Sequence, residues 1–192
     1  VMQRAVPITF ILLAFLTAGL SALRQAAAPP QTAMTQAAQA LLSTLEPQQL
    51  AQVKFPFNGE DRFDWHFIPR ERKGLAFQKM RPRQREAALA FFRAALSESG
   101  YKKAETIRSL EPVLRELERG RQGAPLRDPD LYFFMIFGEP SATGTWGWRY
   151  EGHHISQNWT IARGQALAST PQFLGAKPAE VRQGPLQGTR VL

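Results

Sequence analysis

Residues 146–154 (WGWRYEGHH) concentrate side chains that could do chemistry. They hold two of the four tryptophans, two of the three histidines and one carboxylate. Imidazole and carboxylate groups bind zinc, copper or iron, and they also transfer protons in general acid–base catalysis. The segment therefore predicts a functional site with Glu151 as its catalytic carboxylate. If a divalent transition metal is bound, the predicted ligands are His66, His153 and His154.

Strand geometry limits how these residues can cooperate. In an extended strand, successive side chains point to opposite faces. One face then carries the aromatic residues and one histidine, and the other carries the charged residues and the second histidine: Trp146, Trp148, Tyr150 and His154 against Arg149, Glu151 and His153. Two adjacent histidines on opposite faces cannot easily bind one ion unless Gly152 marks a β-bulge.

Two enzymatic interpretations follow from this segment. In the first, His153 or His154 binds a metal together with His66 and Glu151, and an open coordination position would support hydrolytic or oxidative chemistry. In the second, Glu151 and His153 form an acid–base pair without a metal. The structural alternatives are an ion pair of Glu151 with Arg149 and packing of His154 among aromatic rings.

A binding module is the alternative to an enzyme. Its ligand, a sugar or a peptide, would stack on an aromatic strand flanked by polar groups: Trp146, Trp148, Arg149, Tyr150 and Asn158. Asn158 could also orient His154 through a hydrogen bond. The same tryptophans would serve in an ordinary core. Glu111 and Glu118 share one helix face, where surface charge is favoured over metal ligation.

The N-terminus predicts export. Arg4 is followed by an apolar run over residues 8–23 and a small-residue exit at Ala28, the pattern of a secretory signal peptide spanning residues 1–28. The protein is then periplasmic or extracellular, and it has no stable membrane span after cleavage. The alternative is anchoring by an uncleaved N-terminal helix. Residues 29–192 are predicted to form a single domain.

Composition excludes several chemistries. The chain has no cysteine, which rules out thiol nucleophiles, cysteine-type zinc sites and iron–sulfur clusters. The net charge is +8, but acidic residues lie among the arginines, a pattern typical of a solvated surface. Because no recognised binding motif is present, nucleic acid is not an expected partner. The expected partner is a small molecule, a sugar or a peptide.

The elements that must position these residues change character along the chain. Apolar residues at helix spacing predict helices over residues 31–54, 83–97 and 101–119, with breaks at Pro47 and Pro112 and an end at Gly100. Period-two patterns then predict strands over residues 131–137, 146–154, 156–162 and 165–169. Helices first and strands later imply an α+β fold, in which N-terminal helices pack on a C-terminal antiparallel β-meander.

A series of short motifs resembles one bacterial family in order along the chain. The motifs include FPF at 55–57, WHFIPRERKGL at 65–75, RDP at 127–129, WGWR at 146–149, EGHH at 151–154 and FLG at 173–175. The chain resembles the domain-of-unknown-function family 3500, often carried on exported proteins. The resemblance implies a shared fold, but it carries no catalytic residue because the family has no established activity. It also implies that the chain is the N-terminal part of a longer protein.

Overall fold

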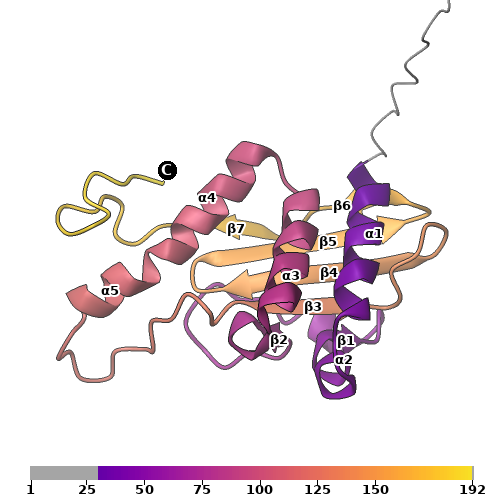
Figure 1. Ribbon diagram of the computed structural model, residues 1–192, viewed down its shortest axis with the longest axis horizontal. Coiled ribbons are helices and arrows are strands. Elements are labelled where there is room, and N and C mark those ends of the chain that lie inside the picture. The colour runs from indigo at the N-terminus through magenta and orange to yellow at the C-terminus, as the bar shows by residue number, and fades with distance from the viewer. Residues whose placement is uncertain (1–29, 192) are drawn as a thin grey trace, which may run out of the picture.

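The computed structural model of the chain describes residues 30–191, and Figure 1 shows its helices lying across one face of a β-sheet. The predicted leader, residues 1–28, and the alternative membrane anchor lie outside the described residues. Within residues 30–191, no helix combines the length and the apolar character that crossing a membrane requires.

Within residues 30–191, five α-helices form where apolar periodicity and proline signals place them. Their bounds are α1 Pro30–Ser43, α2 Pro47–Val53, α3 Pro82–Ala94, α4 Glu98–Ser109 and α5 Glu111–Leu117, and two short 3₁₀ turns span Glu60–Arg62 and Phe77–Lys79. Pro47 and Pro82 each lie at the start of a helix, where a missing N–H costs no hydrogen bond. The predicted break at Pro47 is confirmed.

The start of α4 corrects one prediction. The Ser97 side chain accepts a hydrogen bond from the Gly100 N–H at 3.1 Å, so Ser97 caps α4 and Gly100 lies in its first turn. Gly100 therefore does not end the preceding helix. Pro112 splits the predicted helix over residues 101–119, because α4 ends at Ser109 and α5 begins at Glu111. This break places Glu111 at a helix start.

The sheet is mixed, so the prediction of a purely antiparallel meander is wrong. Its strands are β1 Lys54–Phe55, β2 Leu75–Ala76, β3 Phe133–Phe137, β4 Thr145–Gly152, β5 Ile155–Ala162, β6 Gln165–Ala168 and β7 Gln172–Leu174. Strands β3 to β6 do form an antiparallel meander. However, β1 pairs parallel to β3. The helices α3 to α5 lie in the connection between these two strands, as a parallel pair requires a long crossover.

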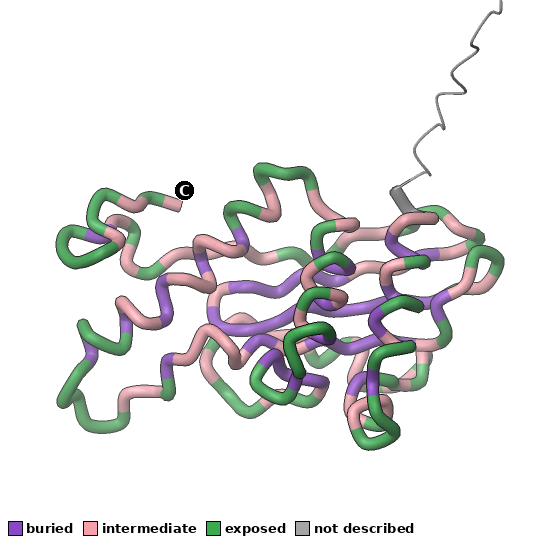
Figure 2. The backbone as a smooth tube through the Cα atoms, viewed as in Figure 1, coloured by how far each residue is buried: buried purple, intermediate pink, exposed green. Residues whose placement is uncertain are grey.

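The face of the sheet beneath the helices carries an aromatic core. Phe91 of α3 lies with its ring centroid 4.5 Å from that of Trp148, and Phe92 lies 4.1 Å from Tyr150. Figure 2 shows the buried residues running along the central strands and the inner sides of the helices. Trp146, Trp148 and Tyr150 share this face, as the alternation predicts.

The other face of the sheet is covered by the segment between β1 and β2. Arg149 holds this segment in place, because its guanidinium donates to the carbonyl oxygens of Arg62 at 2.6 Å and Asp64 at 2.8 Å. Burial lowers the pKa of Arg149. Residues 65–69 form no strand, but the Phe67 carbonyl accepts the His154 N–H at 2.8 Å.

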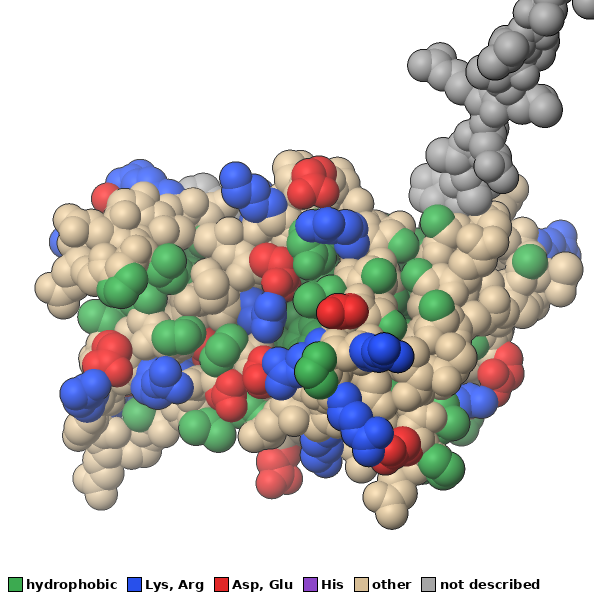
Figure 3. All heavy atoms as spheres, viewed as in Figure 1, with side chains coloured by type: hydrophobic (Ala, Val, Ile, Leu, Met, Phe, Trp, Pro, Cys, Tyr) green, Lys and Arg blue, Asp and Glu red, His purple; other side chains and the backbone are tan. Residues whose placement is uncertain are grey.

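The surface has charges of both signs. Figure 3 shows lysine and arginine side chains interspersed with aspartate and glutamate over one face of the molecule. Elsewhere on the surface, Arg70 pairs with Asp64 at 2.7 Å. The face shown thus agrees with the expectation of a solvated surface.

Candidate functional site

His153 and His154 form the two-residue turn between β4 and β5. The strand register pairs Gly152 with Ile155 without interruption, so Gly152 does not mark a bulge. His154 has a φ of 62°, which ends the extended conformation. The prediction that the two histidines lie on opposite faces of one strand is therefore wrong. Their ring centroids lie 3.9 Å apart.

A buried carboxylate contacts the first of these histidines. Oε1 of Glu111 lies 2.6 Å from Nδ1 of His153, and the two residues are only 3% and 8% exposed. A carboxylate at one ring nitrogen fixes the tautomer and the orientation of an imidazole. The preference for Glu111 as surface charge is thus wrong, because the helix break at Pro112 turns Glu111 inward at the first residue of α5.

A second ion pair, between Arg127 and Glu118, lies next to His153. Arg127 Nη1 is 3.0 Å from Nδ1 and 3.2 Å from Nε2 of His153, while Arg127 Nε donates to Glu118 Oε2 at 2.9 Å. This hydrogen bond from Arg127 lowers the pKa of Glu118, against the effect of burial. Glu118, predicted as surface charge, is also buried.

Tyr132 fixes the turn itself. Its hydroxyl donates to the backbone carbonyl of His153 at 2.7 Å. Burial raises the pKa of Tyr132 well above its ordinary value, so the phenol keeps its proton and remains a donor. Gly152 leaves room for the ring, because a Cβ at this position would lie 2.2 Å from Cδ1 of Tyr132.

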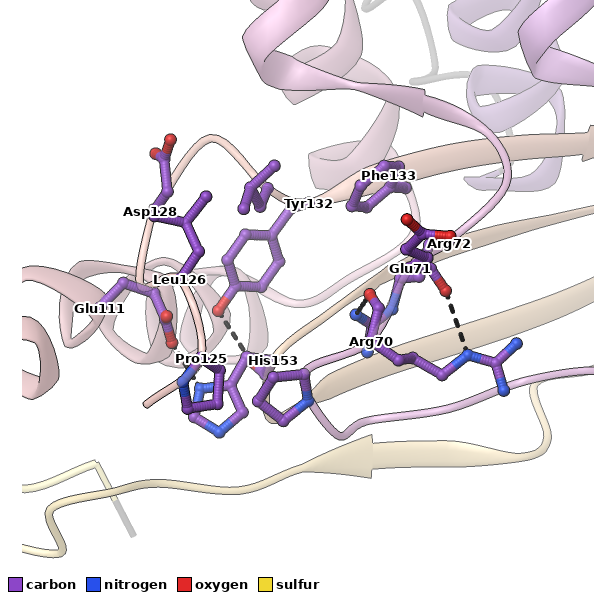
Figure 4. A pocket seen from close by; sticks show the side chains of 12 residues that line it. Arg70, Glu71, Arg72, Glu111, Pro125, Leu126, Asp128, Tyr132, Phe133 and His153 are labelled. Carbon is purple, nitrogen blue, oxygen red and sulfur yellow. Dashed lines mark hydrogen bonds and ion pairs between the residues drawn. The ribbon is translucent and has the colours of Figure 1, made fainter. Parts of the chain in front are cut away.

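These groups border a pocket of about 490 Å³, shown in Figure 4. Glu111 and Tyr132 lie beside His153 on one side of this view, and Arg70, Arg72 and Phe133 lie on the other. Pro69, Pro125, Leu126 and Leu131 add apolar surface from two loops and the segment before β3, and Glu71 and Asp128 add two carboxylates. A hollow that combines apolar walls with convergent polar groups is the usual form of a small-molecule site.

The chemistry available in the pocket is proton transfer. An imidazole whose Nδ1 faces a carboxylate can act as a general base or acid through Nε2. The lining residues include no serine, threonine or cysteine. The part of the chain that the structure describes therefore does not suggest a covalent step on a serine, threonine or cysteine in this pocket.

Glu151 does not face His153 as an acid–base partner. Its carboxylate accepts from Arg72 Nε at 2.9 Å, from the His66 N–H at 2.7 Å and from Ser156 Oγ at 3.2 Å. The alternative ion pair with Arg149 is present at 3.7 Å. These contacts join the segment before β2 to β4 through Glu151, and a catalytic role for Glu151 stays a prediction.

His66 does not join the other two histidines through its side chain. Its Nε2 lies 3.1 Å from Asp64 Oδ1, and its side chain is 37% exposed. Over residues 30–191, no group of three or more histidine, aspartate and glutamate side chains is arranged to hold a metal ion. Metal binding by His66, His153 and His154 stays a prediction.

The predicted aromatic ligand surface lies in the core. Trp146, Trp148 and Tyr150 are at most 1% exposed, so little of their ring surface is open to a ligand in this structure, and ligand binding by these residues stays a prediction. Arg149 donates to Asn158 Oδ1 at 2.6 Å, and Asn158 donates to the Pro171 carbonyl at 2.8 Å. Asn158 therefore orients Arg149, and it has no contact with His154.

The fold and the pocket define an α+β protein with helices on one sheet face and a buried carboxylate–imidazole pair at the β4–β5 turn. The chain matches the model of the family described as "Protein of unknown function (DUF3500)" over residues 27–192. It belongs to this family, as its motifs indicate. No curated protein and no solved structure matches the chain.

Proposed function

We propose that the pocket beside His153 is the active site of an enzyme that transfers a proton to or from a small molecule. The observation that carries this proposal is the 2.6 Å contact between Glu111 and His153 at the edge of a pocket of about 490 Å³. Glu111 orients the ring and stabilises the imidazolium that forms when Nε2 accepts a proton, as the carboxylate does in serine-protease triads.

The other contacts of His153 give its neighbours distinct roles. When Nδ1–H faces Glu111, Nε2 of the neutral ring is the acceptor nearest to Arg127 Nη1, at 3.2 Å. Arg127 thereby helps to hold the imidazole ring in place. Tyr132 holds the backbone of the turn. The apolar part of the substrate lies against Pro69, Pro125 and the neighbouring apolar residues.

Export and a single domain remain part of the proposal. The apolar run and small-residue exit within residues 1–28 support secretion to the periplasm or beyond. A single domain over residues 29–192 is supported by one continuous hydrophobic core that links α1, α3, α4 and the sheet.

Metal dependence is the second candidate. The observation that favours it is the close approach of the His153 and His154 rings, since imidazole suits zinc, copper and iron. Metal content of the full chain, purified without an affinity tag, separates the two candidates. A stoichiometric metal that is lost in His154→Ala supports the metal-dependent form, whereas activity without bound metal supports the acid–base form.

An activated ester tests the acid–base proposal without knowledge of the natural substrate. An accessible, oriented imidazole is expected to hydrolyse p-nitrophenyl acetate faster than buffer alone. His153→Gln should abolish the excess rate, and Glu111→Gln should reduce it roughly 100-fold because the ring loses its orienting carboxylate.

The matched control is His66→Gln, which removes an imidazole that does not line the pocket and should keep the wild-type rate. Circular dichroism of each variant checks that the fold is retained. A His153→Gln variant that is folded and as fast as the wild type would contradict the proposal.

A further inference from the structure

Three cations surround one buried carboxylate near the end of α5. Glu118 contacts Arg127 at 2.9 Å, Arg121 at 3.3 Å and Lys177 at 3.6 Å. The contributing residues come from the end of α5, from the loop before β3 and from the segment after β7. The fold thus brings together cations that are far apart in the chain.

The charges of this cluster do not balance. Arg127 donates to both oxygens of Glu118, through Nε at 2.9 Å and Nη2 at 3.3 Å, and this bidentate contact neutralises the carboxylate. Arg121 and Lys177 then contact the same oxygen, Oε1, at longer distances. Across residues 30–191, neither has another ion-pair partner. Two positive charges are therefore left over.

The two surplus cations are held close together and remain open to solvent. Arg121 Nη1 and Lys177 Nζ lie 3.3 Å and 3.6 Å from the same oxygen, Oε1 of Glu118, and like charges brought to one carboxylate oxygen repel each other. Their side chains are 61% and 54% exposed. Each keeps N–H donors that face outward, since guanidinium and ammonium groups have more donors than Glu118 uses.

His154 adds a polar group beside this cluster. Its carbonyl accepts the N–H of Gly175, two residues before Lys177, at 2.9 Å. Its ring contacts His153 and Phe173, and its ring nitrogens have no hydrogen-bond partner in the described part of the chain.

We infer that Arg121 and Lys177, with His154 beside them, form a binding site for a small oxyanion, the phosphate or carboxylate group of a ligand. The anion bridges the two cations, relieves their repulsion and accepts their unused N–H donors. Arg127 contributes by neutralising Glu118, which would otherwise repel the anion. Arg121, Lys177 and His154 do not line the pocket of His153, so this site does not depend on the proposed acid–base function.

The test is the thermal unfolding midpoint of the full chain in increasing inorganic phosphate, with sodium chloride keeping the ionic strength constant. We expect a saturable rise for the wild type. Lys177→Gln and Arg121→Gln should each weaken the apparent phosphate affinity at least about tenfold, because each removes a charge-assisted contact. Acetate and phosphate, compared at equal ionic strength, distinguish a carboxylate site from a phosphate site.

The control is Arg119→Gln, which removes the same charge from the same stretch of chain. Arg119 pairs with Glu116 and not with Glu118. This variant should keep the wild-type response. A rise that does not saturate, or that is equal in all four proteins, is a general salt effect and overturns the inference. Ester hydrolysis should be unchanged in Lys177→Gln, so failure of this site and failure of the His153 pocket give different results.

Discussion

Buried ionic contacts set the roles of individual residues in this protein. Arg72 and Glu151 form an ion pair with both side chains only 5% exposed, and Arg72 also donates to the Gly152 carbonyl at 3.2 Å. The pair joins the segment before β2 to the strand that leads into the histidine turn. Loss of this ion pair is expected to lower the free energy of unfolding, because each side chain is held by the other.

Glu151→Gln should destabilise the protein by about 3–5 kcal/mol, because it leaves the Arg72 guanidinium buried without a counter-charge. Urea unfolding at pH 7 measures this change. Exposed Glu71, in the same segment, provides the matched control, and Glu71→Gln should cost less than about 0.5 kcal/mol. Equal effects of the two substitutions would argue against a structural role for Glu151.

At the residue scale, the sequence places its candidate site in the segment that also borders the pocket of His153, but it does not predict the side chains that contact His153. Its carboxylate is Glu111, 42 residues away, and its cation is Arg127, 26 residues away. Spacing along a strand relates Glu151 to His153, but contacts between α5 and the β4–β5 turn arise only from tertiary packing. The one available signal was a glutamate directly before Pro112, at a helix break.

At the element scale, the turn between β4 and β5 depends on a close fit between Gly152 and Tyr132. The ring of Tyr132 occupies the space that a side chain at position 152 would need, and its hydroxyl holds the next carbonyl. The geometry of His153 therefore depends on a residue without a side chain.

Gly152→Ala should destabilise the protein by about 1–3 kcal/mol, because the added methyl group forces the Tyr132 ring to move. It should also slow ester hydrolysis by displacing His153. A double-mutant cycle with Tyr132→Ala measures the coupling by urea unfolding. If the clash with Tyr132 causes the loss of stability, Tyr132→Ala lowers the free energy of unfolding less in the Gly152→Ala background than in the wild type. Strictly additive effects of the two substitutions would contradict this explanation.

Most elements follow from local signals, and the exceptions have physical causes. The local sequence predicts the helices that begin with proline. It also predicts the hairpin at Arg163–Gly164, where both turn residues have positive φ. Strands of two or three residues, such as β1, β2 and β7, have too few side chains to show a period. The parallel pairing of β1 with β3 therefore could not be predicted. For the same reason, the sequence did not predict that the sheet is mixed.

At the scale of the whole molecule, the fold links stability to pH through His154. Burial and neighbouring positive charges lower the pKa of His154 to about 4 from 6.5. Below pH 6.5 the unfolded chain binds a proton at this residue while the folded protein does not. The stability contributed by the neutral ring is therefore complete above pH 6.5 and is lost as the pH falls towards 4.

His154→Asn should make the free energy of unfolding fall less steeply between pH 6.5 and pH 4 than in the wild type. Asparagine suits the test because it tolerates the φ of 62° at this position. Urea unfolding at several pH values in this window gives the two slopes. Identical slopes would show that His154 titrates similarly in the folded and unfolded states.

The α+β class, with helices preceding strands, could be predicted because the hydrophobic period changes along the chain. The side of the sheet that each loop covers could not be predicted. The segment between β1 and β2 lies against the helix-free face because Arg149 and Glu151 bind it there, and no periodicity encodes such contacts.

Both margins of the sheet are closed by pairs of short strands. Strands β1 and β2 share the outer side of β3, and β6 and β7 share the outer side of β5. None of these four strands is longer than four residues, and Figure 1 shows them beside the long central strands. Long unpaired strands recruit other chains into intermolecular sheets. Across residues 30–191 the margins of the sheet offer no long unpaired strand as a template, so this topology disfavours the pairing of β3 or β5 with another chain.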